Sequence, residues 1–67
     1  MITFNEISSN FASYVDKSFI IKTSESISIG SFTLKSSDDS KKVLEFIDED
    51  DKLLEVAPSM DYYFELN

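Results

Sequence analysis

The chain has 67 residues, with 13 acids against 6 lysines, a formal net charge of −7, and neither cysteine nor histidine. The lack of cysteine excludes disulfides and thiolate metal sites, and the lack of histidine removes the commonest transition-metal ligand and neutral-pH acid–base group. With 42% hydrophobic residues, we expect residues 1–67 to form a single small domain, stabilised by an apolar core or by self-association.

The net charge lies entirely in the second half of the chain. Residues 1–37 contain three acids and three lysines, whereas residues 38–67 contain ten acids and three lysines. This asymmetry argues against direct nucleic-acid binding, which needs clustered basic residues, and favours a basic protein partner. No apolar run has the roughly 20 residues of a membrane span, and no signal peptide is recognisable. We therefore expect a cytoplasmic protein without membrane contacts.

The first residues carry the signature of a helix start. Residues 3–6, Thr-Phe-Asn-Glu, match the capping box, and Ile2 and Ile7 have the spacing of a hydrophobic staple. The apolar spacing predicts a helix from Phe4 to Val15. Its serines are poor interior helix formers, so this helix needs a sheet to pack against. A short strand at Met1–Phe4 is the competing prediction.

Two strands are expected next. Phe19–Thr23 is β-branched and aromatic, and Ser26–Lys35 alternates apolar with polar residues. The alternation slips by one position at Gly30 and Ser31, so we expect a β-bulge beside this glycine. A polar loop is predicted at residues 36–40.

Residues 43–56 read as a β-hairpin with an acidic tip. A shared core face requires these pairs: Leu44 with Val56 and Phe46 with Leu54. This register predicts a three-residue turn at 49–51. It also places Glu45 opposite Glu55, and we expect apolar burial to outweigh that repulsion.

The chain ends in a further predicted strand. Residues 57–60 read as a turn, with Pro58 ending the hairpin strand. Tyr62, Phe64 and Leu66 then alternate with polar or outward-facing residues, which predicts a strand with a strong core face. The expected fold class is α+β, with one N-terminal helix packed on a small antiparallel sheet of about four to five strands.

The second sheet face is the candidate binding surface. We expect Val43 on it, and the predicted partner-binding residues are Glu45, Ile47, Asp48, Glu49, Asp50, Asp51, Leu53, Glu55, Asp61, Tyr63 and Glu65. An apolar patch rimmed by carboxylates is typical of a partner surface. Two alternatives stay open: loops cover the apolar groups, or the acidic tip only solvates a turn and protects a sheet edge.

No catalytic motif is recognisable. The chain has no glycine-rich phosphate loop, no serine–histidine–aspartate set and no cysteine nucleophile. The acids at 48–51 lack the alternate spacing, central glycine and terminal bidentate glutamate of an EF-hand loop. We therefore expect no enzymatic activity, no cofactor and no dedicated metal site.

The pattern favours a non-enzymatic interaction protein, an inhibitor that docks its acidic hairpin and sheet on a basic, nucleic-acid-binding protein. Acids spaced about 6.5–7 Å apart along strands imitate an array of phosphates. In size and charge the chain is similar to small phage proteins that block restriction or CRISPR nucleases, although the residues match no family. Lysine as the sole cation and frequent Ser, Ile, Phe and Lys are the composition expected of an A/T-rich coding sequence, as in many bacteria and their phages. A phage protein would act in the host cytoplasm. The alternative is a self-associating structural module, for instance a homodimer.

Overall fold

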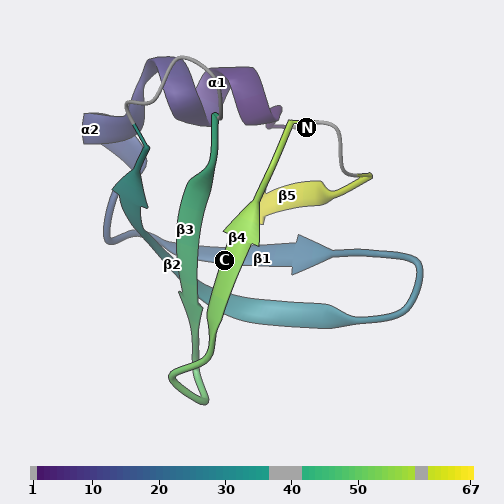
Figure 1. The fold of residues 1–67 in the computed structure, drawn as a ribbon. Helices are drawn as coiled ribbons and strands as arrows, with labels where there is room; N and C mark the ends of the chain where they lie inside the picture. Colours follow the sequence, from purple (N-terminus) through teal and green to yellow (C-terminus); the bar gives the residue numbers. More distant parts are fainter. Residues whose placement is uncertain (1, 37–41, 59–60) are drawn as a thin grey trace.

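The computed structural model describes residues 2–36, 42–58 and 61–67 and shows two short helices above a bent antiparallel sheet (Figure 1). The predicted α+β class is confirmed, with the sheet at the upper limit of the expected strand number. The elements, in chain order, are α1 (Phe4–Ser9), α2 (Phe11–Tyr14), β1 (Ser18–Lys22), β2 (Ile27–Lys35), β3 (Leu44–Asp48), β4 (Leu53–Val56) and β5 (Tyr63–Leu66).

The helix begins as the capping pattern predicts. Thr3 is extended and its hydroxyl accepts a hydrogen bond from the Glu6 backbone N–H at 3.1 Å. Ile7 is fully buried, and Ile2 packs against the same core cluster. Ile2 also forms an isolated β-bridge with Phe64. The competing prediction of a strand is wrong at Phe4, where α1 begins, and Met1 lies outside the described residues.

The helical segment lies where it was predicted, from Phe4 to Tyr14, but it is not continuous: at Asn10 it divides into α1 and α2. Both the backbone N–H and the side-chain amide of Asn10 donate to the Glu6 carbonyl, at 3.1 and 3.0 Å. Asparagine side chains compete with the backbone for such bonds and favour non-helical conformations. The backbone of Asn10 accordingly leaves the helical region, with φ −121° and ψ 38°.

The strands form one sheet in the order β4-β3-β2-β1-β5, with every neighbouring pair antiparallel. Strands β1 to β4 follow one another as neighbours, and β5 returns to the free side of β1. The first half of β2 pairs with β1 and its second half with β3. Figure 1 shows β2 running beside β1 and then turning to run beside β3.

Gly30 lies where the two halves of β2 meet, opposite Asp48 on β3 and Phe19 on β1. A Cβ atom at Gly30 would sit 2.7 Å from the Asp48 Cα and 2.8 Å from the Ile47 carbonyl carbon. The close approach of the β3 backbone therefore explains the glycine.

The bulge predicted at Gly30 and Ser31 is misplaced. Pairing with β3 is continuous from Gly30 to Phe32, and the register shifts between Phe32 and Leu34. The slip in the sequence alternation has another cause: the isoleucines before Gly30 lie on the outer face, whereas Phe32 is fully buried on the inner face. Phe32 thus lies on the opposite face from Ile27 and Ile29 without an inserted residue between them, and the extra residue Thr33 then returns Leu34 to the outer face.

The hairpin register is confirmed. Leu44 pairs with Val56, Phe46 with Leu54, and Glu45 with Glu55. The Asp48 backbone N–H donates to the Lys52 carbonyl at 3.0 Å and so closes a three-residue turn at 49–51. Asp51 has φ 61°, the left-handed conformation expected at the third residue of such a turn.

Aromatic rings connect the strands in the core. Phe19, Phe32 and Phe46 contact one another in sequence, each pair edge-to-face with 5.2 Å between centroids. The buried residues of the cluster are Ile7, Phe19, Ile21, Phe32, Leu44, Phe46, Val56 and Phe64. The predicted core face of the last strand is correct for Phe64, which is buried, and for Tyr62, which packs against the core, but wrong for Leu66, which is 47% exposed. The predicted loop at 36–40 and turn at 57–60 lie partly outside the described residues.

Candidate functional site

The outer face of the sheet, opposite the core, is assembled from residues that pair across all the strands. The pairing gives two rows that start at the β4 edge, Glu55–Glu45–Leu34 and Leu53–Ile47–Ser31–Ser18, and two rows that end at the β5 edge, Ile29–Ile20–Glu65 and Ile27–Lys22–Tyr63. Directly paired residues share a face and contact one another. The rows therefore bring apolar side chains from β1 to β4 together, with carboxylates at both ends.

The apolar part of this outer face is accessible to solvent. Ile27 is 67% exposed, Leu34 and Leu53 are each 54% exposed, and Tyr63 is 43% exposed. Ile20, Ile29 and Ile47 are half-buried between them. Single exposed apolar residues are ordinary on protein surfaces, but a contiguous group marks an interaction site.

The carboxylates of the outer face have two different environments. Glu45 and Glu55 oppose each other beside Leu34, and neither forms an ion pair with a lysine among residues 2–36, 42–58 and 61–67. Glu65 forms an ion pair with Lys22 at 3.2 Å, and the same ammonium lies 5.8 Å from the centroid of the Tyr63 ring. The carboxylates of β3 and β4 on this face are therefore without an ion-pair partner among the described residues, whereas Glu65 of β5 is paired with Lys22.

Asp48 differs from the other acids of the tip. It pairs with Gly30, and its carboxylate accepts the backbone N–H groups of Asp50 and Lys52 at 2.8 and 2.9 Å. These bonds hold the turn in place, as aspartate side chains commonly do. Glu49, Asp50 and Asp51 are exposed, and they are the tip acids that remain available to a partner.

The predicted partner-binding residues thus fall into separate groups. The hairpin residues Glu45, Ile47, Leu53 and Glu55 lie together on the outer face, beside the tip acids. Tyr63 and Glu65 share that face but are separated from the hairpin by β1 and β2. Asp61 is exposed and precedes β5 rather than belonging to it.

The prediction that Val43 belongs to the outer face is wrong. Val43 is 6% exposed and precedes β3, where its carbonyl accepts the Ser36 backbone N–H at 2.9 Å. Conversely, sequence reasoning missed the contribution of Ile20, Ile27, Ile29 and Leu34 to this face. Part of the signal was present in β2, because Ile27 and Ile29 have the opposite parity to Phe32 and so lie on the opposite face, whereas Leu34 returns to the outer face only through the bulge after Phe32.

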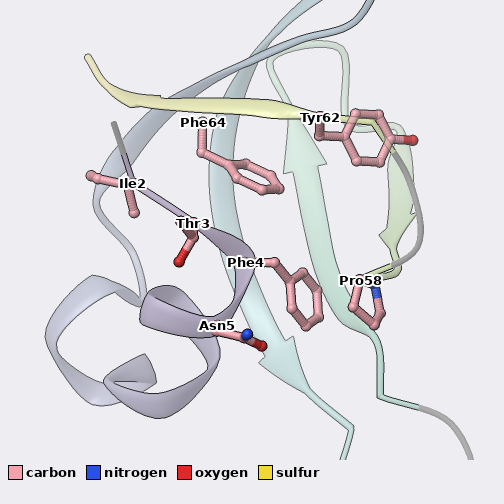
Figure 2. Close-up of a pocket in the computed structure, with 7 residues that line it drawn as sticks. All are labelled: Ile2, Thr3, Phe4, Asn5, Pro58, Tyr62 and Phe64. Atoms are coloured by element: carbon pink, nitrogen blue, oxygen red, sulfur yellow. The ribbon is translucent and has the colours of Figure 1, made fainter.

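A groove of about 270 Å³ lies away from the outer face, between the start of α1 and the segment leading into β5 (Figure 2). It is lined by Ile2, Thr3, Phe4, Asn5, Pro58, Tyr62 and Phe64. The Thr3 hydroxyl in this lining already caps α1. The groove therefore combines apolar side chains with exposed polar groups in nearly equal parts.

Within the described ranges, no group of three or more acidic, histidine or cysteine side chains is placed to hold a metal ion. Neither described helix is long and apolar enough to cross a membrane. No family model, curated protein or solved structure matches this chain.

Proposed function

We propose that this protein is a non-enzymatic binding protein whose outer sheet face and acidic hairpin tip dock on a basic surface of a protein partner. The observation that carries the proposal is the juxtaposition of exposed Leu34 and Leu53 with Glu45 and Glu55, which face each other and form no ion pair among the described residues. Apolar groups supply contact area, and the carboxylates select a basic partner and speed its association.

The charge pattern supports a nucleic-acid-binding protein as the partner. Glu45 and Glu55 are paired across two strands, and the exposed acids Glu49, Asp50 and Asp51 continue the negative charge beyond the strand ends. A rigid set of carboxylates of this kind competes with phosphates for a basic cleft. The protein would then act as an inhibitor of a nuclease or similar enzyme, as phage counter-defence proteins of the anti-CRISPR or anti-restriction type do, in the cytoplasm of the host cell.

The proposal also accounts for a local cost. Like charges directly opposite on neighbouring strands destabilise a sheet by a few tenths of a kcal/mol. Replacing either Glu45 or Glu55 with a neutral residue would remove that repulsion without touching the core. A positively charged partner surface converts the repulsive pair into two favourable contacts, so the pair is better suited to the complex than to the free protein.

The test compares charge reversal at two sites that change the net charge equally. Glu55→Lys reverses a carboxylate of the outer face, and Glu25→Lys reverses an exposed carboxylate in the turn between β1 and β2. The wild-type protein and both variants are immobilised and exposed to bacterial lysate, with washes at low and high salt. Asp48 is left unchanged because its carboxylate holds the turn.

We expect wild type and Glu25→Lys to retain the same basic, nucleic-acid-binding protein, and Glu55→Lys to lose most of it. High salt should release the partner, since exposed charge pairs are screened. The partner bound to wild type should also fail to bind duplex DNA or its own nucleic acid. Equal recovery by the two variants, or a partner that still binds nucleic acid normally, would contradict the proposal.

Self-association is the second candidate function, because four large apolar side chains of the outer face are more than 40% exposed. A homodimer through this face would bury them. Sedimentation of the protein alone distinguishes the two functions: a mass that rises with concentration and falls on Leu53→Ser supports a dimer. A monomer at high concentration supports docking on a different protein.

A further inference from the structure

Strand β4 forms one edge of the sheet. In the strand order β4-β3-β2-β1-β5, its sole neighbour among the described strands is β3. At the other edge, β5 is joined by Ile2 through an isolated bridge to Phe64. Within the described ranges, no backbone hydrogen bond is recorded from β4 to anything except β3.

The hydrogen-bonding pattern identifies which backbone groups of β4 are free. The Asp48 N–H donates to the Lys52 carbonyl, so Asp48 and Lys52 are a hydrogen-bonded pair of the antiparallel ladder. Such pairs alternate along antiparallel strands, so Leu54 and Val56 also bond to β3. The N–H and C=O groups of Leu53 and Glu55 therefore point away from the sheet, where a further strand would pair.

The side chains beside these free groups define the occupant. A strand added to β4 would place its own side chains about 4.5–5.5 Å from those directly opposite. The residue opposite Glu55 would meet the Glu45–Glu55 pair and should be basic. Leu53 is 54% exposed, so the residue of the added strand that lies opposite it should be apolar. Two positions further along the added strand, a residue would lie near the exposed Asp51 and should be basic.

We infer that the β4 edge receives an extended basic segment of the protein partner as a sixth strand. The segment is antiparallel to β4, like every other neighbour in the sheet. On the outer face it carries basic, apolar and basic residues at alternate positions. This inference rests on the proposed function and specifies how the partner is recognised. A second copy is a poor occupant because each chain carries a net charge of −7.

The test uses a defined peptide, Ser-Ser-Lys-Val-Val-Thr-Lys-Ser-Ser, blocked at both ends. The matched control is a peptide of the same composition in which the five central residues are reordered as Lys-Lys-Val-Thr-Val. In an extended conformation its two lysines point to opposite faces. Binding to the whole protein is followed by amide chemical shifts. We expect the first peptide to shift the amides of Leu53 and Glu55 most strongly, and the reordered peptide to bind about tenfold more weakly.

Two changes remove the added hydrogen bonds while leaving the charges of the peptide intact. Glu55→Pro deletes the backbone N–H that points outward from β4, and proline is tolerated in edge strands. Glu55→Gln is its control, because it also removes the carboxylate but keeps the backbone N–H. A peptide N-methylated at both lysines and the central valine cannot donate to β4 and leaves the protein unaltered. We expect Glu55→Pro to bind at least about tenfold more weakly than Glu55→Gln, and the N-methylated peptide to show a similar loss.

The outcomes separate strand addition from the proposed function. Unchanged affinity for the N-methylated peptide, or no binding of the first peptide at millimolar concentration, would overturn strand addition even if Glu55→Pro failed to fold. If the lysate partner is lost on Glu55→Lys but retained on Glu55→Pro, the proposed function stands and strand addition is wrong. A dimer of the protein alone that Glu55→Pro dissociates would assign the edge to a second copy and overturn the inference.

Discussion

Replacing Gly30 by alanine should be among the most destabilising single-methyl changes available in this chain. The new Cβ would lie 2.7 Å from the Asp48 Cα and 2.8 Å from the Ile47 carbonyl carbon. Carbon atoms pack best at about 3.5–4.0 Å, so the backbones of β2 and β3 must separate by about 1 Å. This movement would weaken neighbouring bonds such as that from the Glu49 N–H to the Ile29 carbonyl, 3.0 Å.

The expected loss follows from three terms. Overpacking costs about 1–3 kcal/mol, and one or two weakened hydrogen bonds cost about 0.5–1.5 kcal/mol each. The reduced freedom of the unfolded chain returns about 0.4–1 kcal/mol. Together these terms give a net loss of about 0.5–5.5 kcal/mol, centred on about 3 kcal/mol, which is a large fraction of the stability of a domain this small.

Urea unfolding of Gly30→Ala, monitored by tyrosine fluorescence and circular dichroism, measures this loss. Its matched control is Ser31→Ala, the next residue of β2, which is half-buried and faces outward; we expect the control to change stability by less than about 0.5 kcal/mol. A free energy of unfolding for Gly30→Ala within about 0.5 kcal/mol of wild type would refute the close approach of β3.

Three further changes test local features by the same unfolding measurement. Asp51→Gly should stabilise the protein by up to about 1 kcal/mol because Asp51 has φ 61°, whereas Asp50→Gly should not; equal effects would show that charge alone matters. Thr3→Ala should cost about 1 kcal/mol through loss of the α1 cap, and an unchanged midpoint would mean that the cap contributes nothing. Lys22→Ala should cost less than about 0.5 kcal/mol because the ion pair with Glu65 is half-exposed, at 44% and 47%; a larger loss would require additional contacts of this lysine.

Short-range patterns predicted the hairpin and the helix start well. The choice of an odd-length turn followed from a single requirement, that Phe46 and Leu54 share the core face, and the observed pairing agrees. The cap at Thr3 was readable because all its partners lie within one helical turn. In both places the residues that decide the local structure are neighbours in the sequence.

The features that sequence reasoning missed depend on strands that are distant in the chain. Gly30 is required by the backbone of β3, which no pattern within β2 reveals. Val43 reads as an outward residue when the hairpin is considered alone, yet it is buried in the folded chain. The outer face was predicted from the hairpin and β5, and the central apolar contribution of β1 and β2 emerged only once the strand order was known.

The return of β5 to β1 has a consequence for the order of folding. Strands β1 to β4 are linked as successive neighbours, whereas the pairing of Ile20 with Glu65 joins residues about 45 positions apart. Closing so long a chain segment is entropically slower than forming a hairpin. An early intermediate would therefore expose the edge of β1, with its Phe-Ile-Ile run, before β5 arrives. Such an edge is a template for aggregation, so refolding at high protein concentration should lose material at this step.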